Sequence, residues 1–245
     1  LALKTGAPVI GLIDSAGLRL QEATDALNAF GEIYMKQTLA SGVIPQITAI
    51  FGACGGGLAL FPTLTDFTFM EATKAKLFVN SPNALDGNYA EKNDTAAADF
   101  QSAEAGIVDV VADEAEVLSQ IRTLVSLLPG NNEDDASYVE CTDDLTRASA
   151  ELANCVGDTS VALSIIADDN MFFETKAAYA KEMVTGFIKL NGVTVGAVAN
   201  RSEVVDEEGK VAEKFDAVLT AKGAEKAADF INFCDAFSIP VLSLT

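Results

Sequence analysis

Two consecutive segments of the chain each combine a short apolar run, a turn of small or polar residues, and a helical pattern. Residues 8–14 (PVIGLID) form the first apolar run, and residues 44–51 (IPQITAIF) form the second. An apolar run of this length that ends at a turn is typical of a strand buried on both faces of a parallel sheet. The repeated order of strand, turn and helix therefore predicts an α/β fold.

Helical spacing of apolar residues predicts a helix after the first strand, ending near residue 42. These residues are Ala23, Ala26, Leu27, Phe30, Ile33 and Tyr34. A turn at residues 52–57 and a short helix at residues 58–64 should follow the second strand. Further strands are expected at residues 66–72, 76–80 and 107–111, with a helix at 114–128. Residues 1–6 resemble the last turn of a helix with Gly6 as its C-cap.

A linker is predicted at residues 129–135 (PGNNEDD), because turn formers and acidic residues are concentrated there. We therefore expect two α/β domains, residues 1–144 including the linker from 129, and residues 145–245. The second should contain a helix at residues 145–152, a strand from residue 172, and a hairpin at 185–200 around Asn191-Gly192. A helix at residues 222–237 and a buried strand at 239–245 complete it. In both halves a helix leads into a strand that starts with Pro, which hints at duplicated domains.

The helix expected at residues 222–237 should have one apolar face. The residues on this face are Ala224, Ala227, Ala228, Ile231 and Cys234.

The net charge of −20 argues against nucleic acid or an anionic membrane surface as a partner, since both would be repelled. No apolar run is long enough for a membrane helix, and the first residues do not read as a secretory signal. The four cysteines lack CxxC spacing, which suits a reduced cytoplasm. A phosphate-rich ligand would need a local basic patch, and the only basic residues near the glycine-rich segments are Arg19, Lys36, Lys74 and Lys76.

The chain contains no His. A Ser-His-Asp or Cys-His nucleophilic site, and a metal site or general base built on His, are therefore excluded within these residues, and no metal is expected. Chemistry at a site in this chain must use carboxylates, backbone dipoles or a cofactor.

Residues 52–57 (GACGGG) follow a predicted strand and open a predicted helix. Backbone amides at such a turn can hold an anion or a developing oxyanion, and glycine lets a substrate approach the backbone closely. A turn needed only for helix packing is an equally good interpretation. The other turn, residues 14–22, could supply a second donor, but helix capping by Asp14 and Ser15 with a surface ion pair of Arg19 is the simpler reading.

A resemblance covers nearly the whole chain. Residues 14–70 (DSAGLRLQEATDALNAFGEIYMKQTLASGVIPQITAIFGACGGGLALFPTLTDFTFM) resemble the N-terminal core of biotin-dependent acyl-CoA carboxyltransferases. This family includes propionyl-CoA carboxylase β subunits and the α subunits of glutaconyl-CoA and methylmalonyl-CoA decarboxylases. The likeness continues through residues 126–132 (SLLPGNN), 168–174 (DDNMFFE), 196–200 (GAVAN) and 233–240 (FCDAFSIP).

The resemblance implies a carboxyltransferase fold of two tandem crotonase-like (ClpP/crotonase) domains, the first binding acyl-CoA. Here the second domain, on the biotin side, is expected to be incomplete and the fragment inactive alone. Gly56 and Gly57 are implied as the catalytic pair whose amides hold the thioester oxygen. The substrate-binding residues implied beside them are Ser15, Ala16, Gly17, Arg19, Cys54 and Gly55.

The family's mechanism implies biotin as the cofactor, carried on a biotin carboxyl carrier protein or domain. Carboxybiotin releases carbon dioxide, and its ureido nitrogen takes the α-proton of a short-chain acyl-CoA. The resulting enolate then attacks carbon dioxide. Because the cofactor is the base, a chain without His is compatible with this chemistry. The family also implies a homo-oligomer, and it leaves the acyl chain and the direction, carboxylation or decarboxylation, open.

Two departures stand out. Ala53-Cys54-Gly55 replaces the family's Pro-Cys-Ala, and Asn200-Arg201-Ser202 replaces Asn-Gln-Pro at the start of an acidic, loop-like insert, residues 201–208. Two other functions remain open. One is a crotonase-type hydratase or isomerase that uses carboxylates such as Glu22 as acid and base. The other is a non-catalytic assembly subunit of the same fold.

Overall fold

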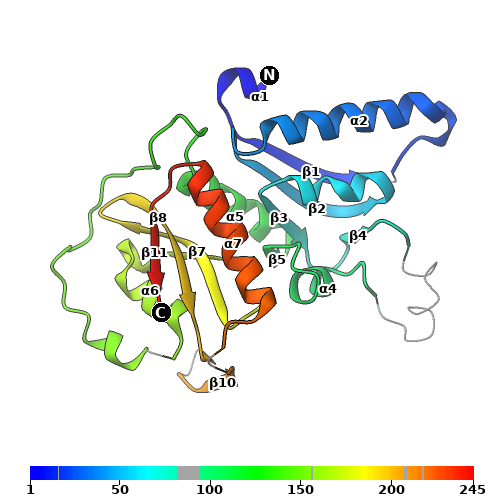
Figure 1. Ribbon diagram of the computed structural model, residues 1–245. Coiled ribbons are helices and arrows are strands. Elements are labelled where there is room, and N and C mark those ends of the chain that lie inside the picture. The colour runs from blue at the N-terminus through cyan, green and yellow to red at the C-terminus, as the bar shows by residue number, and fades with distance from the viewer. Residues whose placement is uncertain (16, 82–93, 156, 207–208, 217) are drawn as a thin grey trace. The chain divides into compact units, whose positions relative to one another are not determined.

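The computed structural model describes residues 1–15, 17–81, 94–155, 157–206, 209–216 and 218–245. The chain divides into two compact units (Figure 1). Unit 1 comprises Leu1–Val125 and Gly130–Glu133, and unit 2 comprises Ser126–Pro129 and Asp134–Thr245. Both contain strands and helices, as an α/β chain should. The predicted domains, with their boundary at residue 144, stay a prediction.

Unit 1 is built on a parallel sheet whose central strand is β2 (Gln46–Gly55). The strand order is β1 (Val9–Ser15), β2, β3 (Phe67–Glu71) and β5 (Val110–Ala112). The first half of β2 pairs with β1 and β3, and its last residues pair with β4 (Lys76–Phe78). Buried apolar side chains, including Ile50, Met70, Leu77 and Val108, form the core below the carboxyl end of β2.

Unit 1 begins with a short helix, and its other helices follow strands. The helices are α1 (Ala2–Thr5), η1 (Leu20–Glu22), α2 (Ala23–Ala40), η2 (Gly56–Leu60), η3 (Pro62–Leu64), α4 (Ala98–Ala103) and α5 (Glu114–Leu127). Gly6 ends α1 in the left-handed conformation, which confirms the predicted C-cap. Helix α2 runs alongside β1 and β2 (Figure 1).

Three local predictions for unit 1 are wrong. Strand β1 is not buried on both faces: it has only β2 beside it in the described part of the sheet, and Leu12 is 60% exposed. Residues 52–55 are not a turn but the end of β2, because β4 pairs with them. The helix expected at residues 58–64 is instead two short 3-10 helices, η2 and η3, separated at Phe61.

Unit 2 contains a four-stranded sheet in the order β11 (Val241–Leu244), β8 (Val193–Asn200), β7 (Met183–Leu190) and β6 (Phe172–Thr175). Strand β11 is parallel to β8, and the other pairs are antiparallel. The predicted hairpin is confirmed as β7 and β8. Its turn places Asn191 and Gly192 at φ 51° and 80°, which this residue pair adopts readily. The Asp168 carboxylate fixes the turn by accepting hydrogen bonds from both amides.

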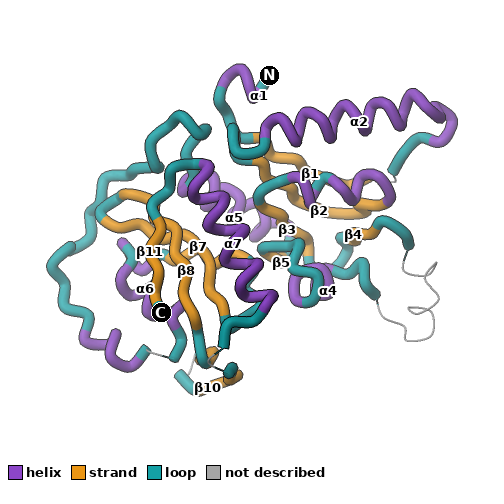
Figure 2. Tube along the Cα trace, in the orientation of Figure 1, coloured by secondary structure: helices purple, strands orange, loops and turns teal. Residues whose placement is uncertain are grey.

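Successive side chains of β7 point to opposite faces of this sheet, and a different helix covers each face. Val184 and Ile188 pack with Leu163 of α6 (Thr159–Ile166). Phe187 points the other way and meets Phe230 of α7 (Ala221–Ala236), with 5.0 Å between ring centroids. Figure 2 shows α7 running along the sheet. The remaining elements are η5 (Ala150–Asn154), η6 (Asp168–Asn170), β9 (Glu203–Val205) and β10 (Val211–Lys214).

Several expectations for unit 2 are also wrong. Residues 145–152 do not form a helix apart from the start of η5, because the Asp144 carboxylate accepts bonds from the Thr146 amide and hydroxyl and closes a local turn. The insert after Asn200 is not merely a loop, since its residues 203–205 form β9, paired with β10. Strand β11 is not buried: Val241 is 41% exposed.

The apolar face expected for α7 is wrong in part. The buried residues are Gly223, Lys226, Phe230 and Cys234, whereas Ile231 is exposed. No helix in the described ranges is long and apolar enough to cross a membrane.

Candidate functional site

The carboxyl ends of β1 and β2 lie side by side in unit 1. Ser15 pairs with Cys54 after a register shift near the end of β1. The Ser15 hydroxyl accepts a hydrogen bond from the Gly17 amide at 3.1 Å, and a Cβ on Gly17 would lie 3.9 Å from the Gly55 carbonyl oxygen. The structure thus brings together the two turns that the sequence singled out. Ala16, also a predicted site residue, lies outside the described residues.

Asp14 links these two strand ends and does not cap a helix as expected. Its Oδ1 accepts a hydrogen bond from the Ala53 amide at 3.3 Å, and a Cβ on residue 52 would collide with the carboxylate. The N-cap of α2 is Glu22, without a side-chain cap bond. The Glu22 carboxylate forms an ion pair with Arg19 at 3.3 Å, and the Arg19 side chain is 74% exposed. This is the surface ion pair expected for Arg19.

Each of three successive glycines has a different physical reason to be glycine. A Cβ on Gly55 would lie 2.7 Å from the ring of Phe78, so this position needs glycine for packing. Gly56 has φ +64° and open space around its Cα, so it is glycine for its backbone conformation. A Cβ on Gly57 would lie 2.9 Å from the Tyr34 hydroxyl. Packing therefore explains Gly55, but it does not explain Gly56.

The amides of Gly56 and Gly57 belong to the first turn of η2. The first N–H groups of a helix have no acceptor within it, so they can meet a ligand or solvent. Because η2 is a 3-10 helix of only five residues, the expected helix dipole is a minor contribution here, and the individual N–H groups are what the turn can offer.

Cys54 is part of the core and cannot act as a nucleophile in this conformation. Its side chain is fully buried, and its thiol donates to the Leu58 carbonyl at 3.5 Å. Burial raises the pKa of the Cys54 thiol to about 12. Contact of residue 54 with a substrate would therefore involve the backbone.

A cavity of about 390 Å³ lies between α2 and the sheet of unit 1 and reaches the carboxyl end of β1. Ser15 lines it at the end of β1, Leu58 and Phe61 line it beside the glycine turn, and Ile33 lines it from α2. Its size falls within the range of small-molecule sites in proteins.

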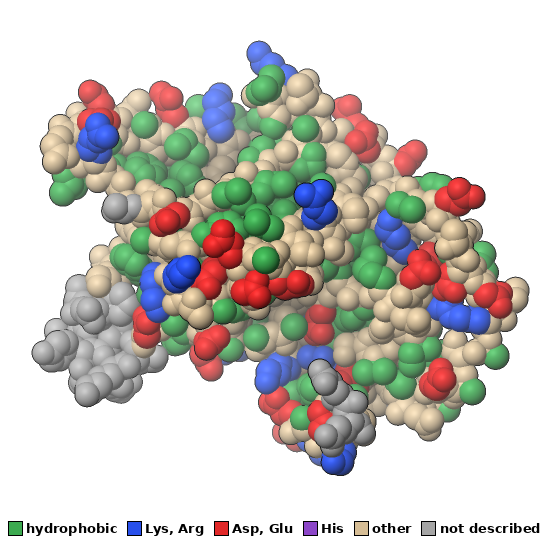
Figure 3. Space-filling model, turned by 180° about the vertical axis from the view of Figure 1, so that it is seen from behind, with side chains coloured by type: hydrophobic (Ala, Val, Ile, Leu, Met, Phe, Trp, Pro, Cys, Tyr) green, Lys and Arg blue, Asp and Glu red, His purple; other side chains and the backbone are tan. Residues whose placement is uncertain are grey.

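Two of the four basic residues named near the glycine-rich segments, Arg19 and Lys76, are engaged in ion pairs. Lys76 is held in an ion pair with Asp94 at 2.6 Å. Figure 3 shows acidic and basic side chains interspersed over the face seen from behind. Within the described ranges there is no group of three or more Cys, Asp or Glu side chains that could hold a metal ion.

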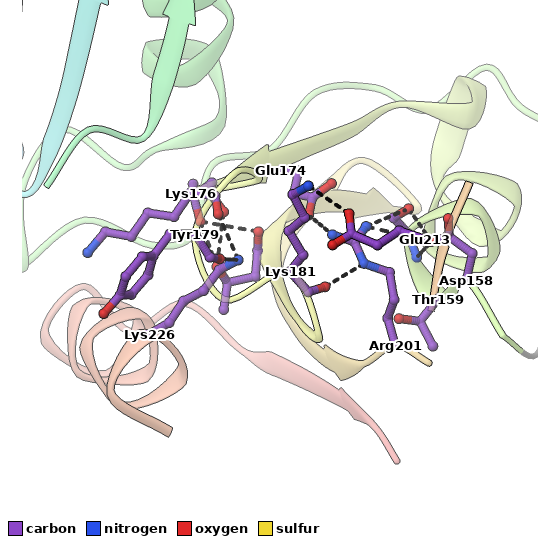
Figure 4. Close-up of polar contacts among 12 residues, drawn as sticks. Asp158, Thr159, Glu174, Lys176, Tyr179, Lys181, Arg201, Glu213 and Lys226 are labelled. Carbon is purple, nitrogen blue, oxygen red and sulfur yellow. Dashed lines mark hydrogen bonds and ion pairs between the residues drawn. The ribbon is translucent and has the colours of Figure 1, made fainter. Parts of the chain in front are cut away.

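Unit 2 contains a separate network of buried charges (Figure 4). Arg201 donates to the Lys181 carbonyl at 2.6 Å and forms ion pairs with Asp158 and Glu174 at 3.7 Å and 3.4 Å. Lys226 is 1% exposed and donates to the carbonyls of Lys176 and Tyr179, both at 2.8 Å. Burial lowers the pKa of Lys226 to about 8 and raises the pKa of Glu174, which Arg201 opposes.

The family model for the carboxyl transferase domain matches residues 1–245, the whole chain. The chain belongs to this family.

Similar proteins include subunits of a carboxylase, a decarboxylase and a transcarboxylase. A propionyl-CoA carboxylase carboxyltransferase subunit from Haloferax mediterranei is 40% identical over 99% of the chain, and a methylmalonyl-CoA decarboxylase α subunit from Veillonella parvula is 35% identical over 99%. The solved structure of transcarboxylase 12S, described as a hexamer with hydrolysed methylmalonyl-CoA bound, superimposes with a TM-score of 0.87 at 34% identity over the entire chain. The match confirms the predicted crotonase-like α/β fold. The chain spans about half the length of these carboxyltransferases, 47% to 48%.

Two contacts of this carboxyl transferase domain do not follow from its sequence. Helical periodicity puts Tyr34 on the apolar face of α2 but does not indicate that its hydroxyl reaches Gly57. The family pattern marks Arg201 of unit 2 as a departure but does not indicate its burial among carboxylates. No local signal marks either contact, because each joins residues at least 20 positions apart.

Proposed function

We propose that this chain provides the acyl-CoA side of a biotin-dependent carboxyltransferase, in a longer protein that transfers a carboxyl group between biotin and a short-chain acyl-CoA. The observation that carries the proposal is the Gly56–Gly57 turn, which lies beside the Ser15–Gly17 strand end and has a glycine that packing does not require. Family membership and the cavity of about 390 Å³ next to this turn support it.

The chemistry assigned to the turn is stabilisation of negative charge. When the α-proton of an acyl thioester is removed, charge accumulates on the thioester oxygen, and fixed backbone N–H groups stabilise it. Gly56 lets the substrate come close, because no side chain blocks the backbone there.

Biotin, carried on a partner domain or protein, would supply the carboxyl group and take up the α-proton. The observations above concern the Gly56–Gly57 turn of unit 1, and we assign the acyl-CoA side of the reaction to that turn. Glu22, one of the carboxylates that a hydratase reaction could use, forms a surface ion pair with Arg19 and does not line the cavity, which favours carboxyl transfer over that alternative.

We expect the full-length protein to transfer a carboxyl group between free biotin and at least one member of a panel of malonyl-, methylmalonyl- and glutaconyl-CoA. Formation of the decarboxylated acyl-CoA, with and without biotin, measures this. A biotin-independent hydration or isomerisation of an unsaturated acyl-CoA would favour the crotonase-type alternative. A protein that binds no acyl-CoA would favour a non-catalytic subunit.

We also propose that the full-length protein is a homo-oligomer. Apolar side chains of β1 and α2 are exposed in this chain, including Leu12, Leu27 and Leu39 at 60%, 63% and 57%, and large exposed apolar surfaces often mark contacts with other protein segments. The 12S relative is described as a hexamer. Light scattering of the full-length protein at micromolar concentration should give a multiple of the subunit mass, and a monomer would refute the proposal.

A further inference from the structure

Tyr34 joins α2 to the glycine turn through a long-range hydrogen bond. Its hydroxyl donates to the Gly57 carbonyl oxygen at 2.5 Å, across 23 positions of sequence. The hydroxyl also fills the space beside the Gly57 Cα, since a Cβ there would lie 2.9 Å from it. The position of this one oxygen atom is therefore tied directly to the backbone of the turn.

Two phenylalanine rings hold the Tyr34 ring in place. Phe30, one turn earlier on α2, lies 6.0 Å from it between centroids, and Phe61, at the end of η2, lies 5.7 Å away with its plane perpendicular. The tilted contact with Phe30 and the edge-to-face contact with Phe61 restrict both the position and the orientation of the Tyr34 ring. A tyrosine hydroxyl is a protonated donor at neutral pH, and burial raises the pKa of the Tyr34 hydroxyl further above its usual value.

The glycine turn needs such an anchor. Gly56 and Gly57 have no side chains to restrict their backbone dihedral angles, and glycine pairs have more conformational freedom than any other pair. Amides stabilise a developing oxyanion well only if they are already oriented before the charge forms. A turn made of two glycines is therefore suited to close approach of a substrate but poorly suited to preorganisation, unless a neighbouring group restricts it.

We propose that Tyr34 is a positioning residue for the oxyanion turn. Its hydroxyl holds the Gly57 carbonyl so that the amides of the glycine pair stay directed at the thioester oxygen of the acyl-CoA. This inference rests on the proposed function of the turn. It adds a residue on α2 that acts through Gly57 and does not itself touch the substrate.

The test is Tyr34→Phe in the full-length protein, because phenylalanine keeps the ring contacts and removes only the hydroxyl. We expect kcat for carboxyl transfer to fall about 10-fold, as for loss of one hydrogen bond that supports the transition state, with KM changed less than about 2-fold. Infrared difference spectra of bound propionyl-CoA, with ¹³C at the thioester carbon, should show a smaller downshift of the carbonyl stretch than in the wild type. Tyr138→Phe, which alters a ring that is 64% exposed, is the matched control and should change neither quantity.

The outcomes separate this inference from the function on which it rests. If Tyr34→Phe keeps the wild-type kcat and carbonyl frequency, Tyr34 does not position the turn. Loss of thermal stability with an unchanged carbonyl frequency would assign Tyr34 a purely structural contribution and overturn the proposal as well. A wild-type protein that shifts the carbonyl frequency but transfers no carboxyl group refutes the transfer reaction alone, and the frequency of the variant still decides the place of Tyr34. A wild-type protein without any carbonyl shift overturns both.

Discussion

Replacing Gly57 with Val in the full-length protein should slow carboxyl transfer by about 10²- to 10³-fold, the loss that follows removal of one oxyanion donor. A Cβ at residue 57 would lie 2.9 Å from the Tyr34 hydroxyl, so the turn or Tyr34 must move. That movement would displace the backbone amides of the glycine pair from the position in which they meet the thioester oxygen. Steady-state carboxyl transfer with the acyl-CoA that the wild type uses best measures the effect.

Gly31→Val is the matched control for this change. Gly31 lies within α2, and a Cβ there meets no other atom within 4 Å. The control should therefore fold and transfer carboxyl groups at close to the wild-type rate. Folding of Gly57→Val is checked by circular dichroism and thermal unfolding. If Gly57→Val is folded and as active as the control, the glycine run is only a packing turn and the site assignment is wrong.

Local sequence patterns predicted the elements whose structure depends on local chemistry. The hairpin at Asn191-Gly192 follows from two residues that accept positive φ, and α5 and α7 follow from helical periodicity. Local sequence patterns predicted the wrong secondary structure where a contact with a distant part of the chain determines it. Residues 52–55 look like a turn from their glycine content, yet they extend β2 because β4, more than 20 positions later, pairs with them.

In the candidate site, too, some features follow from local sequence and others depend on distant residues. The two turns could be found from sequence, because each follows an apolar run, and parallel strands bring their carboxyl ends together at one edge. The distinct reasons for Gly55 and Gly56 could not be found, because one depends on the ring of Phe78 and the other on a backbone angle. The burial of Lys226 on α7 could not be found either, because its ammonium group donates to two carbonyls from the segment before β7, about 50 positions earlier in the sequence.

The departure from the family pattern at Arg201 has a structural consequence. Arginine at this position in place of the family's glutamine brings a permanent positive charge into the sheet end of unit 2, where its side chain is 5% exposed. Asp158, which it faces, has other partners in the amides of Ser160 and Val205. Glu174 depends more on Arg201, because Glu174 Oε1 is buried and meets Arg201 Nη2 at 3.4 Å, without a hydrogen bond to another group in the described residues.

Arg201→Met should lower the free energy of unfolding of unit 2 by about 3–5 kcal/mol, the range found when one partner of a buried ion pair is removed. Methionine retains much of the apolar volume, so the loss comes mainly from uncompensated carboxylates and from the unpaired Lys181 carbonyl. Native-state hydrogen exchange of amides in β7 and β8 measures it, because these strands form the middle of the unit 2 sheet. Arg19→Met is the matched control, since the exposed pair of Arg19 with Glu22 contributes little.

The pH dependence of the variant separates an electrostatic cause from lost packing. Burial already raises the pKa of Glu174, and Arg201 opposes that rise, so removing Arg201 raises the pKa further. A carboxyl group whose pKa is higher in the folded state than in the unfolded state contributes stability at low pH, and this contribution disappears as the pH rises through the folded-state pKa. The deficit of Arg201→Met relative to wild type should therefore be larger at pH 8 than at pH 5. Adding Glu174→Gln should remove part of the deficit at pH 8, and a deficit that is independent of both pH and Glu174 would show that Arg201 stabilises unit 2 through packing alone.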